Sequence, residues 1–344
     1  MKRELILQID HELVIIKKEC TLFCTLDHNF QQKSLEFKLT DYRNSSFISN
    51  STNAIADFYD GFKNSSQIIE WMRERPYGNT RIREVSGEKD IIVVIPTIDT
   101  NGEFAQRCRD EIYHGLHIIF VESGLPRDFY FNFANSCNVG VKKAMEYKPK
   151  WIICSNDDVL KIDDVGALKS ELSKYDSNSI LSVIPKSESK GFCFITSYNF
   201  LFRILSKFDF LKVFQSVALD MRFNIKYSVQ CSFRSLNKLG KLMYIFLTKR
   251  RLKVFPSGQI RIVSGMFASS VEGNIYDSTY INGIEDFDLA IRLLNNGQKP
   301  CFINYRLGVI GGASLGNTYE RFLRSAVSRI YLDYKIKKGQ LKIE

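Results

Sequence analysis

Three short apolar runs, each followed at once by polar residues, constrain this 344-residue chain more than any other feature. The runs cover residues 91–95, 116–121 and 151–154, and stretches with helical spacing of apolar residues separate them. Apolar runs without alternation are typical of strands buried on both faces of a parallel sheet. Strands that alternate with helices predict right-handed crossovers and an α/β fold with a mostly parallel central sheet.

Polar residues, with one proline, close each of the three predicted strands. They are Pro96, Thr97 and Asp99 after the first, Glu122 after the second, and Asn156, Asp157 and Asp158 after the third. The carboxyl ends of parallel strands meet at one sheet edge, where open α/β sheets bind nucleotides. We therefore expect a nucleotide-type crevice in which clustered carboxylates hold a hard divalent metal. The alternative for each acid is that it caps a helix.

A second acidic cluster lies far from the first in the sequence. Glu285, Asp286 and Asp288 occupy the first turn of a helix that we predict between Gly283 and Gly297. A helix dipole favours acids at this end, and this is the alternative explanation for Asp286. Three acids in four residues exceed what capping needs. We expect Asp288 to pair with Arg292 four residues on, in a structural role.

The remaining segments have their own character. Residues 1–88 are expected to form an accessory layer or an extra sheet edge, with a helix over residues 65–75. Residues 200–256 form a basic, helical insertion within a domain that spans residues 89–318, and residues 319–344 form a basic closing helix. Lys and Arg number twelve between Arg203 and Lys253, against two acids. Such a segment is typical of a membrane-surface element or of a solvated helical subdomain.

Composition sets the expected setting. Hydrophobic residues make up 44% of the chain and charged residues 25%, as in ordinary globular proteins, while the net charge of +10 indicates an anionic partner. The eight scattered cysteines are expected to be reduced thiols. No signal peptide or membrane span is apparent, so we expect a cytoplasmic protein, peripheral at the inner membrane face.

The order of these features resembles the family 2 glycosyltransferases, whose nucleotide-sugar-binding domain has a GT-A-type fold. The resemblance runs from about residue 90 to residue 335, outside the basic insertion. Its motifs are the Pro96–Asp99 strand ending, Glu122 after the second strand, the segment from Asn135 to Gly140, the D-x-D-like Asn156–Asp158, the loop around Gly265, and the E-D-x-D-L-x-x-R helix at residues 285–292. One departure is that residues 309–316 contain no histidine, where the family often has a metal ligand.

The resemblance implies an inverting, metal-dependent sugar transfer from a UDP-, GDP- or dTDP-sugar to a hydroxyl of a glycan or lipid-linked acceptor. Asp158, with Asn156, would hold Mg²⁺ or Mn²⁺, Asp286 would be the general base, and Glu285 would orient it. The residues implied at the donor are Pro96, Thr97, Asp99, Glu122, Asn138, Asn156, Asp157 and Gly265. An anionic membrane surface is a further expected partner, and nucleic acid is not. A nucleotidyltransferase and a catalytically silent sugar- or nucleic-acid-binding module are the alternatives; residues 96–103 lack the basic triphosphate loop of the former.

Overall fold

The computed structural model describes residues 5–9, 12–16, 43–124, 128–176, 179–183, 190–195, 218–231, 251–253, 260–261, 266–269, 275–281, 283–298, 300–310 and 319–343. The chain divides into two units, Met1–Tyr42 and Arg43–Glu344. In the first unit, β1 (Leu5–Ile9) and β2 (Glu12–Ile16) pair antiparallel, with Leu5 opposite Ile16. Two strands therefore replace the single strand-like run that the sequence indicates there. A further strand-like run at residues 35–39 lies outside the described residues.

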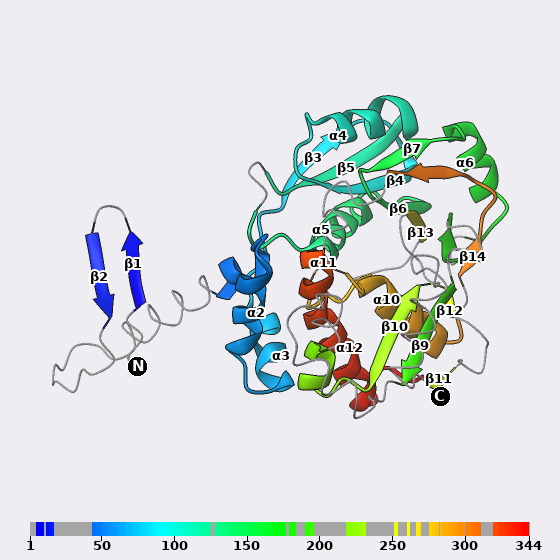
Figure 1. The fold of residues 1–344 in the computed structure, drawn as a ribbon. Helices are drawn as coiled ribbons and strands as arrows, with labels where there is room; N and C mark the ends of the chain where they lie inside the picture. The colour runs from blue at the N-terminus through cyan, green and yellow to red at the C-terminus, as the bar shows by residue number, and fades with distance from the viewer. Residues whose placement is uncertain are drawn as a thin grey trace. The chain divides into compact units, whose positions relative to one another are not determined.

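A seven-stranded sheet organises the second unit (Figure 1). Its order is β14 (Cys301–Phe302), β8 (Leu181–Ser182), β13 (Met266–Ser269), β6 (Trp151–Ser155), β4 (Glu88–Thr97), β5 (Leu116–Glu122) and β3 (Arg81–Val85). β4 lies between β5 and β6 and pairs parallel with both, so the predicted core of three parallel strands is confirmed.

The sheet as a whole is mixed, because β14, β8, β6, β4 and β5 run in one direction and β3 and β13 run against them. β3 lies antiparallel on β5, and β13 lies antiparallel between β6 and β8. β14 is parallel to β8. The prediction rested on strand–helix–strand units, which impose parallel pairing through a crossover. β3 and β13 are not joined to their neighbours in this way, so the sequence pattern said nothing about their direction.

Helices cover both faces of the sheet. α5 (Phe133–Met145) and α10 (Glu285–Asn295) pack on the face that carries Val94 and Cys154. α4 (Glu103–Arg107), the π-helical turn η1 (Cys108–Ile112) and α6 (Val165–Leu172) belong to the opposite face. Gly140 allows α5 its close approach, because a Cβ there would lie 2.3 Å from Val94 Cγ1. The predicted helices at residues 133–147 and 165–175 are confirmed.

A further hydrophobic core joins the beginning of the second unit to its end. α2 (Thr52–Asp60) and α3 (Ser65–Glu74) contribute Tyr59 and Ile68, while α11 (Tyr319–Arg324) and α12 (Ala326–Lys337) contribute Leu323 and Val327. Residues 43–48 are also helical. The Tyr59 hydroxyl donates to the Leu323 carbonyl at 2.7 Å. Helices from before residue 89 and after residue 318 therefore share one core.

The closing helix differs from its prediction. It breaks at Ser325, so two helices stand where one was expected. α12 is also largely buried, and its basic residues meet acids inside the protein. Arg329 binds Asp220 at 2.9 Å, and Lys335 binds Asp277 at the same distance.

Two small sheets complete the unit. β7 (Val159–Lys161) and β15 (Leu307–Val309) form an antiparallel ribbon directly after the end of β6. β9 (Lys190–Ile195) pairs with β10 (Tyr227–Cys231), β11 (Arg251–Lys253) and β12 (Ile260–Arg261). The described parts of the expected helical insertion thus include β10 and β11 besides a helical turn at residues 218–222. The rest of the insertion lies outside the described residues. Within the described chain, no helix has the length and hydrophobicity needed to cross a bilayer.

Candidate functional site

The ends of the three parallel strands meet as the sequence predicts. Thr97 at the end of β4 lies directly opposite Glu122 at the end of β5. The Ser123 backbone N–H donates to the Thr97 carbonyl at 3.0 Å, which keeps the segments that follow β4 and β5 together beyond the sheet. On the other side, the Thr97 hydroxyl donates to Asp157 Oδ2 at 2.9 Å. Thr97 therefore links the polar ends of all three strands, and Pro96 lies one position earlier, opposite Val121.

A cavity of about 350 Å³ opens at this edge, within the usual size of ligand pockets. Its lining residues are Asn79, Arg81, Ile98, Asp99, Glu122, Ser123, Gly124 and Asp128. Asp99 and Glu122 were predicted from the sequence. Asn79 and Arg81 were not, because their presence depends on β3 pairing with β5, and no pattern in the sequence indicates that pairing.

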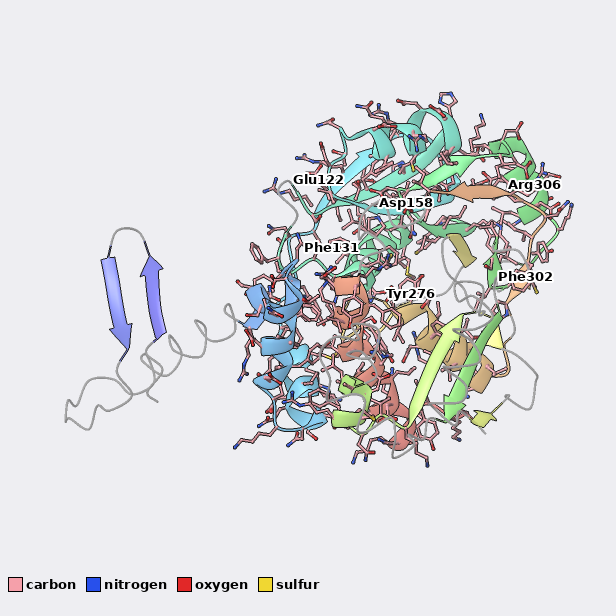
Figure 2. The ribbon with its side chains drawn as sticks, in the orientation of Figure 1. Glu122, Phe131, Asp158, Tyr276, Phe302 and Arg306 are labelled. Carbon is pink, nitrogen blue, oxygen red and sulfur yellow. The ribbon has the colours of Figure 1, made fainter. Side chains whose placement is uncertain are left out.

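Glu122, which is labelled in Figure 2, is a buried carboxylate with an exposed fraction of 9%. Its Oε2 accepts from the Thr100 backbone N–H at 3.1 Å and from the Thr100 hydroxyl at 2.7 Å. These bonds, together with the charges of Arg83 and Arg81, hold the pKa of Glu122 below its ordinary value. Glu122 does not cap a helix. Its partner Thr100 precedes α4, whose cap is Gly102, and the helix after β5 is capped by Asn132. It is an ionised acceptor in the cavity wall.

The polar residues after β6 separate into two roles. Asp157 is tied to Thr97, and burial together with the adjacent charge of Asp158 raises its pKa. Asp158 is 5% exposed, and its Oδ1 has no hydrogen-bond partner in the described structure. Neither acid caps the next helix, because Asp164 does so by accepting from the Ala167 N–H at 2.8 Å. An unpaired buried carboxylate oxygen is the kind of group that a cation or an ordered water satisfies.

The donor set for a metal is sparse among the described residues. They contain no group of three or more His, Cys, Asp or Glu side chains that could surround a metal ion. Asp158 Oδ1 fits a hard cation by its chemistry and by its lack of a partner. Asn156 is half-buried nearby in the chain. A metal at this edge would therefore take most of its ligands from phosphate oxygens and water, as Mg²⁺ commonly does.

The second acidic cluster begins α10 on a strained turn. Gly283 has φ 116° and Ile284 has φ 79°, both in the left-handed region. A β-branched residue rarely adopts this conformation, which costs on the order of 1–3 kcal/mol and tends to occur at functional sites. Glu285 and Asp286 follow immediately as the first residues of the helix. The turn therefore fixes the position of this acidic pair at some cost in stability.

Both acids of this pair have raised pKa values. Burial and then the charge of Asp286 raise the pKa of Glu285 to about 7, and burial raises that of Asp286 to about 6. Asp286 Oδ1 also accepts from the Phe287 N–H at 2.9 Å, so Asp286 satisfies one backbone N–H in the first turn of α10. Carboxyl groups that exchange a proton near neutrality are suited to acid–base chemistry.

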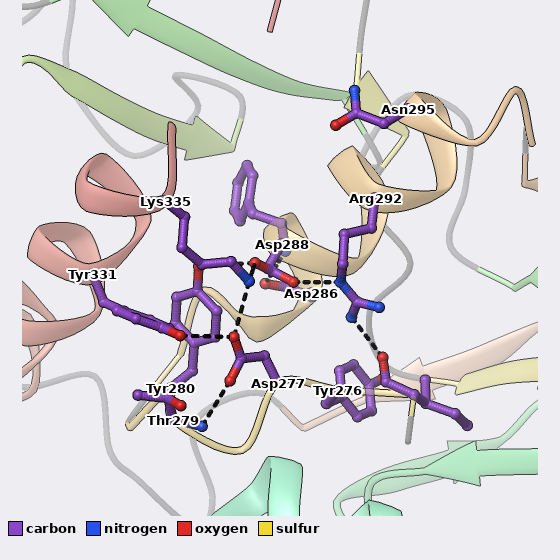
Figure 3. Close-up of polar contacts among 12 residues, drawn as sticks. Tyr276, Asp277, Thr279, Tyr280, Asp286, Asp288, Arg292, Asn295, Tyr331 and Lys335 are labelled. Atoms are coloured by element: carbon purple, nitrogen blue, oxygen red, sulfur yellow. Dashed lines mark hydrogen bonds and ion pairs between the residues drawn. The ribbon is translucent and has the colours of Figure 1, made fainter. Parts of the chain in front are cut away.

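The third acid of the helix has a structural role, as predicted. Asp288 is fully buried and accepts from Arg292 Nε at 2.6 Å, the expected pairing with the residue four positions on (Figure 3). Asp288 Oδ2 also contacts Lys335 Nζ and accepts from the Tyr280 hydroxyl at 3.1 Å. Because Lys335 also binds Asp277, one buried network ties the start of α10 to α12.

Asn138, which the resemblance places at the donor, binds the backbone of Tyr276. Its Nδ2 donates to the Tyr276 carbonyl at 2.8 Å, and its Oδ1 accepts from the Tyr276 N–H at 3.0 Å. Asn132, the cap of α5, donates to the carbonyls of Ser278 and Tyr280 at 2.7 and 3.1 Å. The two asparagines hold residues 276–280 along α5. This clamp was missed from the sequence, since asparagines near a helix start are usually assigned to capping alone.

These contacts bring α10 close to the end of β6. Leu289 of α10 packs in one hydrophobic cluster with Cys137 of α5 and Cys154 of β6. The charge of Glu285 contributes to the raised pKa values of Cys137 and Tyr276, so the acidic pair lies beside this cluster. Cys154 precedes Asn156 by two residues in the chain. Gly265 and the loop at residues 311–318 lie outside the described residues.

Comparisons of the chain with protein-family models, with curated proteins and with solved structures found no match.

Proposed function

We propose that this protein is a metal-dependent glycosyltransferase of the GT-A type that transfers a sugar from a nucleoside-diphosphate donor to an acceptor hydroxyl with inversion. One observation carries the proposal: the parallel strand ends gather an ionised Glu122 and an unpaired Asp158 at one edge, and a strained helix start carries two carboxyl groups with raised pKa values. The resemblance in the sequence assigns the same residues to the same chemistry.

The donor would lie along the carboxyl edge of the sheet. Its nucleoside would occupy the cavity beside Glu122 and Asp99, and its diphosphate would extend toward Asp158. A divalent cation held by Asp158 and Asn156 would neutralise the charge that develops on the leaving diphosphate. Asp157, which accepts the Thr97 hydroxyl, would keep the ends of β4 and β6 in register.

The acidic pair would serve the acceptor. Asp286, as general base, would take the proton from the attacking hydroxyl, and the raised pKa matches that task near neutral pH. Glu285 would share the proton with Asp286 or bind the acceptor. A single displacement by the acceptor oxygen inverts the anomeric carbon, so no covalent nucleophile is needed.

The proposal is tested by titrating the full chain with UDP, GDP and dTDP, each with and without Mn²⁺, by isothermal calorimetry. We expect binding of at least one of them, strengthened by Mn²⁺. If none binds, the proposed function is wrong, as it also is if a panel of their sugars releases no nucleoside diphosphate.

The role of Asp286 is tested separately. Asp286→Asn should lower the turnover of the preferred nucleotide-sugar by about a hundredfold or more while donor affinity stays within about threefold, since general-base catalysis contributes roughly 10²–10⁴ in rate. An equal loss of donor affinity would assign Asp286 to the structure of the site. Glu103→Gln, in the first turn of α4, is the matched control.

A further inference from the structure

The π-helical turn η1 contacts the bend at residues 156–158, which follows β6. The Tyr113 backbone N–H donates to the Cys108 carbonyl at 2.9 Å, and this bond between residues five apart defines a π-helix. In an α-helix, side chains five positions apart point about 140° away from each other, since each residue turns the chain by about 100°. The wider π-turn brings Cys108 and Tyr113 above one another, and both side chains contact the end of β6 and the bend.

Tyr113 acts on the bend through two consecutive hydrogen bonds. The Ser155 hydroxyl donates to the Asn156 carbonyl at 2.9 Å, which uses the one proton that a serine hydroxyl carries. The bond of 2.8 Å between the Tyr113 hydroxyl and Ser155 Oγ therefore has Tyr113 as its donor. Tyr113 and Ser155 are both fully buried, so water does not compete for these groups. The Tyr113 hydroxyl thus fixes the orientation of the Asn156 carbonyl through Ser155.

The next two carbonyl groups of the bend are held as well. The Asp157 carbonyl accepts from the Cys108 thiol at 3.5 Å, and the Asp158 carbonyl accepts from the Ile310 N–H at 2.9 Å. The Thr97 hydroxyl donates to the Asp157 carboxylate at 2.9 Å. Every backbone carbonyl of the bend therefore has a donor, whereas Asp158 Oδ1 is buried and has no partner among the described residues.

We infer that Tyr113 and Cys108 are positioning residues that preset Asp158 Oδ1 as a cation ligand by fixing the backbone of the bend. The inference rests on the proposed function, which places a divalent cation at Asp158. Groups that orient metal ligands typically change metal affinity roughly 10–100-fold when they are removed, because the ligand must then be ordered as the metal binds. Neither residue supplies a ligand itself, since the Tyr113 hydroxyl and the Cys108 thiol already donate to Ser155 and Asp157.

The test measures Mn²⁺ binding to the full chain by electron paramagnetic resonance of the free ion, first without nucleotide and then with UDP, GDP or dTDP in excess. Asp158→Asn defines the site, because only the binding that this variant loses belongs to Asp158. Tyr113→Phe and Cys108→Ala should each weaken this component about tenfold, at the lower end of the range because both residues act through the backbone. Cys108→Ser keeps a donor and should stay within about threefold of the parent.

Further variants separate positioning from a loss of stability. Ser155→Ala should weaken Mn²⁺ binding as much as Tyr113→Phe does, and the double variant should bind no more weakly, since both act through the same Asn156 carbonyl. Tyr59→Phe is the matched control, because Tyr59 is also fully buried and its hydroxyl donates to the Leu323 carbonyl at 2.7 Å in another core. Tyr59→Phe should lower the midpoint of thermal unfolding as Tyr113→Phe does and leave Mn²⁺ affinity unchanged.

The outcomes distinguish this inference from the function on which it rests. If Tyr113→Phe weakens Mn²⁺ binding no more than Tyr59→Phe does, or if Cys108→Ser binds as weakly as Cys108→Ala, the positioning role is wrong while the transferase proposal stands. If no Mn²⁺ binding depends on Asp158, with or without nucleotide, the inference is overturned, and nucleotide binding and turnover still decide the proposed function. If Mn²⁺ bound at Asp158 responds to Tyr113→Phe but no nucleotide binds, the proposed function fails and the positioning role stands.

Discussion

The acidic start of α10 makes a prediction about stability that is independent of catalysis. Glu285→Gln replaces a half-buried carboxyl group with a neutral group of the same shape, beside Asp286 and after the left-handed Ile284. We expect this substitution to stabilise the fold at pH 8 and to have little effect at pH 5. The reason is that the ionised form of Glu285 is the one that burial disfavours.

The magnitude follows from the shift in proton affinity. The pKa of Glu285 rises from 4.5 to about 7, and each tenfold change in proton binding corresponds to about 1.4 kcal/mol, so the ionised group costs the fold about 3 kcal/mol. A carboxyl group with a raised pKa contributes stability below its unfolded value, near pH 4.5, and that contribution is lost as the pH rises through about 7. The Glu285→Gln variant cannot ionise at this position, so it keeps this contribution to stability as the pH rises.

The measurement is the free energy of unfolding by urea, followed by circular dichroism, for the parent and the variant at pH 5 and pH 8. We expect a gain of about 2–3 kcal/mol at pH 8 that falls below about 1 kcal/mol at pH 5. Glu103→Gln is the control, because Glu103 is an exposed acid at the start of α4 and should change stability by less than about 0.5 kcal/mol at both values. An equal gain at both pH values, or a loss at pH 8, would refute the reasoning.

Two further predictions concern the buried network and the end of β6. Lys335→Met leaves Asp277 and Asp288 without their buried cation and should lower the free energy of unfolding by about 3–5 kcal/mol. The control is Lys338→Met at the exposed end of α12, which should change the free energy of unfolding little. A loss below about 1 kcal/mol in urea unfolding would show that Arg292 and the tyrosines are enough to stabilise the two carboxylates. Asp158→Asn should weaken the Mn²⁺-dependent part of nucleotide binding at least about tenfold, while Asp157→Asn, which keeps an acceptor for Thr97, should not. Equal effects of the two in calorimetry would contradict the distinction between them.

The local sequence pattern was sufficient to predict the three parallel strands and the contacts within one helix. The runs at residues 91–95, 116–121 and 151–154 became the parallel strands, and their polar ends met because parallel strands must end on one edge. The pairing of Asp288 with Arg292 followed from helix geometry alone. These predictions needed only spacing and polarity, which a single sequence contains.

Pairings between distant segments could not be predicted in this way. β13 entered the sheet antiparallel, and β3 brought Arg81 to the cavity, through contacts that no local pattern indicates. The contact of Asn138 with Tyr276 likewise joins residues that are 138 positions apart in the chain. Lys335 belongs to the predicted basic closing helix, and nothing in the local pattern indicates that this residue is buried.

The start of α10 gathers several unfavourable features that one favourable network offsets. Ile284 is strained, Glu285 and Asp286 resist ionisation, and both acids lie where the helix dipole compensates only in part. Two residues on, Asp288 is fixed to Arg292 and Lys335, so the helix cannot relax by rotating its acids toward water. Backbone strain and breaches of local sequence rules tend to cluster at functional sites, which is consistent with the role proposed for this acidic pair. Glu285→Gln should remove one of the unfavourable features, and Lys335→Met should remove part of the network that offsets them. The two substitutions therefore test whether the network around Asp288 holds an unfavourable helix start in place.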